Sequence, residues 1–307
     1  MKKFIFEIAI VAFATVSICI LVRLYWINCF PNKIAPPYSE GITTLVLGAS
    51  SSECAINDSI LSTYLNLSES SLYFCANYNS LIWFDKHSKN SIDTVLCSAG
   101  LVSFLYYDPN VPVSFPARVH KTERYSMYSY DEYLNLFTKN KLDALWNFLF
   151  SLKITDFSIS RIGGHYEQVF REKINDPRAK EAIQKKADEY GYSGYTEEVL
   201  RRDAREQAYF LRKMKEYCDE HSIVFILFNP PYYNISDFIS NKGYKEYLLH
   251  EFGDDLLIAD YEHFVFPDLS YYGDYEHLNY KGSCYLSEWI KKKGLELITA
   301  KDYCKTN

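Results

Sequence analysis

The feature that most constrains this chain is a long apolar run at its N-terminus. Residues 4–22 follow Met1-Lys2-Lys3 and carry one charge, Glu7, before Arg23. This is close to the ~20 apolar residues that a helix needs to cross a bilayer. The sequence therefore predicts a transmembrane helix within residues 1–30. The two lysines before the run favour an N-in orientation, which places everything after residue 30 outside the cytoplasm.

The same run would also suit a cleaved signal peptide or a helix buried in a soluble core. No small-x-small cleavage site ends the run, so we expect an uncleaved, single-pass signal anchor. Residues 31–42 contain three prolines and are expected to form a short, stiff linker. The rest of the chain, residues 43–307, is expected to form one α/β domain.

Composition excludes several functional classes. The formal charge is −6, and a general nucleic-acid binder needs a cationic face to neutralise phosphates, so nucleic acid is not an expected partner. A hydrophobic content of 48% argues against disorder. The eight cysteines show no CxxC and no paired Cys/His spacing, so we expect no zinc site and no other metal. Their wide scatter favours small buried apolar residues over a disulfide framework.

Short apolar, β-branched runs alternate with helical stretches along residues 43–105 and again after residue 220. This alternation predicts a parallel sheet with helices on both faces. Helices are expected at 58–65, at 81–89 and, last in the chain, at about 280–295. The expected strands are 43–47, 71–74, 92–97, 223–228 and, more weakly, 256–259.

The alternation lapses in the middle of the chain. Residues 107–195 are too long for a simple crossover, and we expect a helical insertion there. A strong amphipathic helix follows, with Thr196 as its N-cap. The arginines and lysines of this helix, including Arg201 and Arg212, are interleaved with acids, which favours a solvated outer face over an anion site.

Two places in the sequence could carry chemistry, and the first is the run from Leu45 to Glu53. Here a buried strand ends in Gly48-Ala49-Ser50 and further hydroxyls. Ser50 would lie at the carboxyl end of the first strand, where open α/β sheets bind ligands. The helix turn after it would aim backbone N–H groups at a developing negative charge. The alternative is that this serine is an ordinary helix N-cap.

The second place is the segment from Tyr271 to Gly282, just before the last expected helix. Asp274 and His277 are three residues apart in a turn. A carboxylate in that position can hydrogen-bond Nδ1 of the imidazole and leave Nε2 as a base for a hydroxyl, as nucleophilic serine catalysis requires. The alternative is a surface histidine beside an acid.

Taken together, these segments resemble the SGNH (GDSL-like) hydrolase superfamily. Gly48-Ala49-Ser50 is similar to the Gly-Asp-Ser of that family. Asp274-x-x-His277-Leu-Asn279 followed by Gly282 is similar to the Asp-x-x-His-Leu-Asn-x-x-Gly form of its membrane-anchored branch, which includes teichoic acid D-alanyl transfer and alginate-type O-acetylation proteins. The resemblance covers roughly residues 43–105 and 220–295. It implies a three-layer α/β/α flavodoxin-like sheet.

The resemblance also implies a role for individual residues. Ser50 would be the nucleophile, His277 the base and Asp274 the residue that orients the base. Asn77 could donate to the oxyanion. The family usually supplies a second donor from an Asn after the third strand, where this chain has Cys97-Ser98-Ala99-Gly100. No metal or diffusible cofactor is needed for this chemistry.

The expected function is therefore an extracytoplasmic serine esterase or O-acyltransferase. The apolar N-terminal run implies the membrane as one partner. The resemblance implies the other, an acyl donor or acylated glycan of a cell-surface or exported polysaccharide. The alternative is a catalytically weak or inactive protein of the same fold that binds glycans or assists assembly, which the missing Asn favours.

Overall fold

The structure of the chain is a computed structural model. It describes residues 2–29, 41–68, 74–87, 91–100, 197–203, 205–233, 242–273 and 276–305. The expected insertion at 107–195 and all but the last two residues of the expected linker lie outside these ranges.

The N-terminal run forms one continuous helix, α1 (Lys2–Cys29). Its stretch Lys3–Val22 is long and apolar enough to cross a membrane, and none of it is buried against other parts of the chain. The length and composition expected for a membrane-spanning helix are thus confirmed. α1 belongs to a different compact unit from the sheet described next.

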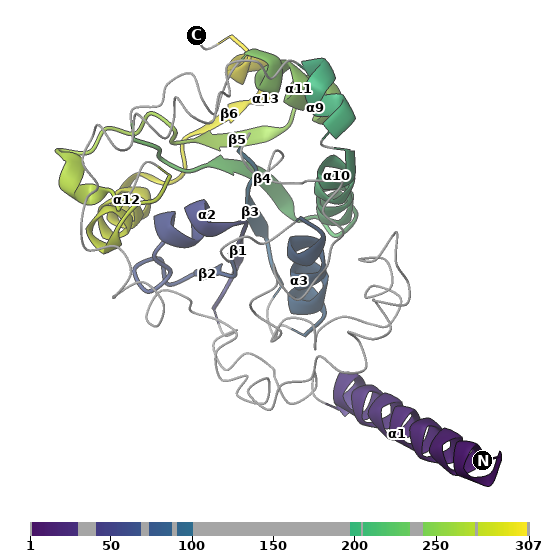
Figure 1. Cartoon of the computed structure of the whole chain (residues 1–307). Helices are drawn as coiled ribbons and strands as arrows, with labels where there is room; N and C mark the ends of the chain where they lie inside the picture. The colour runs from purple at the N-terminus through teal and green to yellow at the C-terminus, as the bar shows by residue number, and fades with distance from the viewer. Residues whose placement is uncertain are drawn as a thin grey trace. The chain divides into compact units, whose positions relative to one another are not determined.

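The second unit is built on a mixed sheet of six strands in the order β2-β1-β3-β4-β5-β6 (Figure 1). The first five strands in this order run parallel, and β6 pairs antiparallel with β5. The parallel α/β sheet predicted from the sequence is therefore confirmed for five strands, and the antiparallel β6 was not expected. The strands are β1 (Thr44–Leu47), β2 (Tyr64–Asn66), β3 (Thr94–Ser98), β4 (Val224–Asn229), β5 (Leu257–Asp260) and β6 (Leu297–Thr299).

Helices lie on both sides of this sheet (Figure 1). On one side, α2 (Ser50–Ala55) contacts α12 (Tyr280–Lys293), and on the other, α3 (Phe74–His87) contacts α10 (Arg205–Glu220). One hydrophobic core cluster includes alternate strand residues, such as Val46 and Leu96, together with Leu286 of α12. The remaining helical elements are α9 (Glu197–Asp203), α11 (Lys242–Phe252), η7 (Leu269–Tyr271) and α13 (Ala300–Tyr303).

The expected helix at 58–65 was wrong, and of the expected strand at 71–74 only Phe74 is described, which is helical. Phe74 begins α3, residues 71–73 lie outside the described ranges, and β2 (Tyr64–Asn66) falls where the helix 58–65 was expected. Turns occupy most of that stretch, since Ser and Thr there compete for backbone hydrogen bonds. Asp58 instead accepts a hydrogen bond from Asn66 N at 2.9 Å, which fixes the start of the edge strand.

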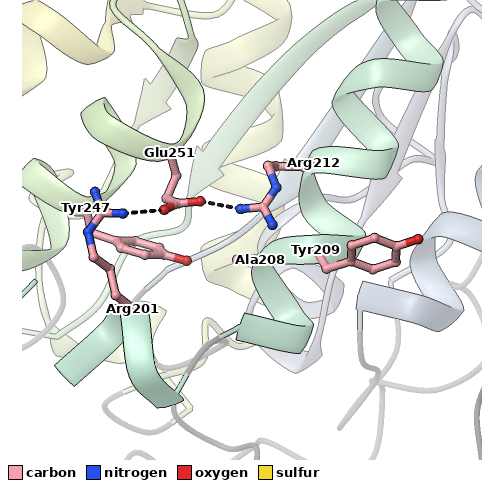
Figure 2. A pocket seen from close by; sticks show the side chains of 6 residues that line it. All are labelled: Arg201, Ala208, Tyr209, Arg212, Tyr247 and Glu251. Atoms are coloured by element: carbon pink, nitrogen blue, oxygen red, sulfur yellow. Dashed lines mark hydrogen bonds and ion pairs between the residues drawn. The ribbon is translucent and has the colours of Figure 1, made fainter. Parts of the chain in front are cut away.

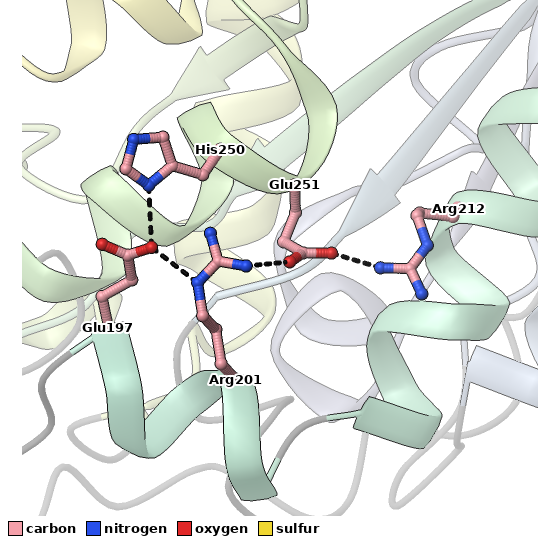
Figure 3. A network of polar contacts seen from close by, with 5 residues as sticks. All are labelled: Glu197, Arg201, Arg212, His250 and Glu251. Carbon is pink, nitrogen blue, oxygen red and sulfur yellow. Dashed lines mark hydrogen bonds and ion pairs between the residues drawn. The ribbon is translucent and has the colours of Figure 1, made fainter.

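Charged side chains of α9, α10 and α11 join these three helices at the surface. Glu251 of α11 accepts from Arg201 of α9 at 2.8 Å and also pairs with Arg212 of α10 (Figure 2). Arg201 in turn donates to Glu197 at 2.7 Å, and Glu197 contacts His250 Nδ1 at 2.7 Å (Figure 3). Where the sequence predicted one amphipathic helix after Thr196, the structure has two, α9 and α10.

This network makes stability depend on pH in the acid range. The hydrogen bonds from His250 and then Arg201 hold the pKa of Glu197 below its usual value. A depressed carboxyl pKa contributes stability that is present above the unfolded-state pKa and is lost as the pH falls through the folded-state pKa. We expect Glu197→Gln to lower the midpoint of thermal unfolding at neutral pH, by an amount that shrinks as the pH approaches about 3.

The matched control is Glu198→Gln, which removes the same charge at the neighbouring exposed position. It should leave the unfolding midpoint nearly unchanged. If Glu197→Gln lowered the midpoint of thermal unfolding equally at acid and neutral pH, the role of the Glu197 carboxylate would be contradicted.

Candidate active site

Ser50 and His277 meet in the folded unit although 227 positions separate them. His277 Nε2 lies 2.7 Å from Ser50 Oγ, which is hydrogen-bond distance. Both side chains are partly buried, so the pair is shielded but still reachable. The arrangement matches a hydroxyl nucleophile beside its base.

The turn before α2 frees the Ser50 hydroxyl for this contact. The N-cap of α2 is Ala49, which makes no side-chain capping bond, and Ser50 is the first residue inside the helix. Gly48 has φ +152, and a Cβ there would overlap Ser52 Oγ and lie 2.7 Å from Ser98 Cβ. Only glycine fits at this point, where β1 turns into α2. The alternative reading of Ser50 as a helix cap is therefore wrong.

The loop carrying His277 is held closed by backbone bonds at its base. Gly273 N donates to His277 O at 2.9 Å, and Tyr272 forms an antiparallel bridge with Leu278. Asn279 then caps α12, because its Oδ1 accepts from Gly282 N at 3.0 Å. Its Nδ2 donates back to Ser270 O at 2.7 Å and Tyr272 O at 3.2 Å. These bonds fix where the imidazole enters the site.

A buried polar contact ties the serine helix to the helix that follows His277. The backbone N–H of Asn57, just after α2, donates to Ser287 Oγ of α12 at 2.8 Å. The Asn57 side chain also donates to Cys284 Sγ at 3.4 Å. Asn57 and Ser287 are fully buried. The contact therefore helps to hold the two halves of the site in register.

Removing the Ser287 hydroxyl tests this contact. Ser287→Ala leaves the buried Asn57 N–H without its acceptor, and an unpaired buried donor costs about 1–3 kcal/mol of unfolding free energy. Urea denaturation should show that loss. Ser51→Ala is the control, because it removes a half-buried hydroxyl of α2 that makes no hydrogen bond in the described structure. Equal losses in the two variants would contradict the prediction.

Asn77 lies in the first turn of α3 and contacts the same turn as the serine. Its Oδ1 accepts a hydrogen bond from Gly48 N at 3.2 Å, and the residue is fully buried. Within the described part of the chain, Asn77 Nδ2 has no hydrogen-bond partner. Because the bond to Gly48 fixes which end of the amide is the oxygen, the unused end is a donor. A buried donor without a partner is costly, so it calls for a function such as binding an oxyanion.

The residues of the motif before His277 are described only in part. Asp274 and its neighbour Tyr275 lie outside the described residues, so the orienting carboxylate remains a prediction. Tyr271 and Tyr272 are packed into an aromatic cluster. The Tyr271 ring stacks on Phe266 at 5.4 Å between centroids and has Lys281 Nζ 3.9 Å from its own centroid.

Sequence reasoning missed several residues that shape the site. Asn66 of β2 donates to Ser52 O at 3.2 Å and to Ile56 O at 2.8 Å, and so satisfies carbonyls at the end of α2. Asn57 and Ser287 were missed as well. Asn279 and Gly282 belong to the motif noted in the sequence. Their position just before an expected helix could have indicated that Asn279 caps that helix.

Comparison with known proteins adds nothing to this geometry. No family model, no curated protein and no solved structure matches the chain. Within the described ranges, no group of three or more His, Cys, Asp or Glu side chains is placed to hold a metal ion.

Proposed function

We propose that this protein is a serine esterase or O-acyltransferase that forms an acyl-enzyme on Ser50. The observation that carries the proposal is the 2.7 Å contact between Ser50 Oγ and His277 Nε2. Such a pair is the minimal arrangement for nucleophilic catalysis by a hydroxyl.

The position of the pair in the sheet supports the same conclusion. The order β2-β1-β3-β4-β5 is that of flavodoxin-like sheets, and it reverses between β1 and β3. Open α/β sheets bind ligands outside the carboxyl ends of their strands at this switch point. Ser50 follows the carboxyl end of β1, at that edge.

The chemistry follows from the atoms in place. Ser50 Oγ attacks an acyl carbonyl while His277 Nε2 takes its proton. The tetrahedral oxyanion is held by Asn77 Nδ2 and the Ser50 backbone N–H. The protonated imidazole then gives its proton to the leaving oxygen, and the C–O bond to it breaks. In the second half, water or a sugar hydroxyl attacks the acyl carbonyl while His277 takes its proton. The ester bond to Ser50 then breaks, and His277 returns the proton to Ser50 Oγ. Asp274 would steady the imidazolium.

The location and substrate follow from features outside the site. α1 would anchor the protein, and the lysines at its start favour an orientation in which the α/β unit lies outside the cytoplasm. An acyl donor or acylated glycan of a cell-surface or exported polysaccharide is the substrate class implied by the SGNH resemblance. An anchored enzyme suits an acyl group delivered at the membrane.

A second candidate is a binding or assembly protein that keeps this fold without turnover. The observation that favours it is the end of β3, where Ser98, Ala99 and Gly100 stand and no Asn is present among the described residues. One missing oxyanion donor typically lowers the rate by about 10²–10³-fold.

A fluorophosphonate probe separates the two candidates, because it reacts only with activated serines. We expect stoichiometric labelling of the folded full-length chain in detergent. Heat-unfolded protein is the control and should not react. Failure of the folded protein to label would support the binding function instead.

The proposed role of Asn77 gives a kinetic prediction. Asn77→Ala removes the free Nδ2 donor, so kcat for an activated ester should fall about 10²–10³-fold with KM little changed. Steady-state kinetics measures both. Thermal unfolding is followed in parallel, because the variant also removes the acceptor of Gly48 N. A folded variant with the wild-type kcat would exclude Asn77 from the oxyanion site.

A further inference from the structure

A pocket lies between α9, α10 and α11, and it shares no residue with the Ser50–His277 site. Its volume is about 470 Å³. Figure 2 shows Glu251 entering from α11, between an arginine of α9 and an arginine of α10. The lining residues are Arg201, Ala208, Tyr209, Arg212, Tyr247 and Glu251.

The two arginines of this pocket differ in how many donors they have already used. Arg201 donates Nε to Glu197 at 2.7 Å and one terminal nitrogen to Glu251 at 2.8 Å. Arg212 pairs with Glu251 through Nη1 alone. Within the described part of the chain, Nε and Nη2 of Arg212 contact no acceptor. That edge of a guanidinium carries two parallel N–H groups, which match the oxygens of a carboxylate or phosphate.

The shape around Arg212 leaves room for a ligand. Ala208, one helical turn earlier on α10, is buried and too short to fill the space, and Tyr247 of α11 is also buried. Tyr209 is 49% exposed beside them, so an aromatic surface is open to solvent. Glu251 holds the Arg212 guanidinium in place from its other side (Figure 2).

The charge of the lining also favours an anion. Among the lining residues, two arginines face one carboxylate, Glu251. Outside the lining, Glu197 contacts both Arg201 and His250 (Figure 3), so this second carboxylate offsets the charge of Arg201 and not that of Arg212. From the sequence, the arginines of this region were expected to lie on a solvated outer face. Arg212 differs, because it lines a pocket and uses only Nη1 in its pair with Glu251.

We propose that this pocket binds a small ligand through a carboxylate or phosphate group held on the Nε–Nη2 edge of Arg212. Glu251 positions the guanidinium, and Tyr209 offers a ring face to the rest of the ligand. The proposal is independent of the acyl-transfer chemistry, because none of its residues belongs to the serine site.

The test uses inorganic phosphate and benzoate as probes, with benzyl alcohol as the uncharged control, by ligand-observed NMR and calorimetry on the full-length chain. We expect saturable binding of at least one anion and none of the alcohol. The anion that binds identifies which source of the charged group the pocket prefers. Absence of saturable binding by both anions would overturn the proposal.

Substitutions of Arg212 test whether the anion binds at this residue. Arg212→Gln should weaken the bound anion at least about tenfold, which corresponds to losing one charge-assisted fork. Arg212→Lys keeps the positive charge but lacks the two parallel N–H groups, so it should also weaken anion binding. This variant tests the proposal if Arg212→Gln does not fold. Lys215→Gln is the matched control, since it removes one positive charge from the same helix, where Lys215 pairs with Asp219 at 2.7 Å and does not line the pocket. Equal affinity in wild type, Arg212→Gln and Arg212→Lys would mean that the arginines serve only to join the helices.

Discussion

Replacing Ser50 with Ala is expected to lower the turnover of an activated ester by about 10⁴-fold or more. The reason is that the hydroxyl forms the acyl-enzyme, and the remaining donors stabilise only a direct attack by water. Fluorophosphonate labelling should disappear in the same variant. The free energy of unfolding should change little, because Ser50 makes no helix-capping bond.

Ser51→Ala is the matched control for that experiment. It removes a hydroxyl from the next residue of the same helix, and no contact joins Ser51 to His277 in the described structure. Its turnover and labelling should equal those of the wild type. If Ser50→Ala retained the wild-type rate, or Ser51→Ala lost as much, the nucleophile would be another residue.

Replacing Gly282 with Ala is expected to cause the largest loss of stability among single changes near the site, about 3 kcal/mol. A Cβ at this position would overlap the carbonyl oxygen of Tyr271 and lie 3.1 Å from Leu278 Cβ. The carbonyl cannot move freely, because it accepts from Asn279 N at 3.1 Å. To relieve the overlap between the new Cβ and this carbonyl, α12 would have to move away from the backbone at Tyr271.

Urea denaturation measures that loss, and ester turnover should fall with it because the separated segment carries His277. Glu288→Ala, an exposed change on the same helix, should stay within about 0.5 kcal/mol of the wild type. Wild-type stability of Gly282→Ala would show that the turn around Asn279 is not packed as described.

The sequence predicted the elements whose pattern is strong and local. β1, β3, β4 and β5 are continuous apolar runs that end in Gly, Ser, Asn or Asp, and each was expected to within about two residues. β2 and β6 have three residues each, too few to show a period, and both lie at the edges of the sheet. Edge strands of this length are set by tertiary contacts such as the bond from Asn66 N to Asp58.

The candidate site was predictable where element order determines proximity. Ser50 follows the first strand and His277 precedes α12, so packing α12 against α2 brings them together. The contacts of Asn57 with Ser287 and Cys284 were not predictable, because no local pattern marks a pair of residues so far apart in the chain. Asn77 was identified as following an expected strand at 71–74, of which the structure describes only Phe74, the first residue of α3. Its position in the first turn of α3 nevertheless brings it to Gly48.

The most direct test of the account is peptide mapping by mass spectrometry after fluorophosphonate treatment of the wild type and of His277→Gln. The account predicts one adduct on the wild type, on Ser50, and labelling slowed by orders of magnitude in folded His277→Gln, which lacks the base. An adduct on any other residue, or equal labelling rates in the two proteins, would contradict it.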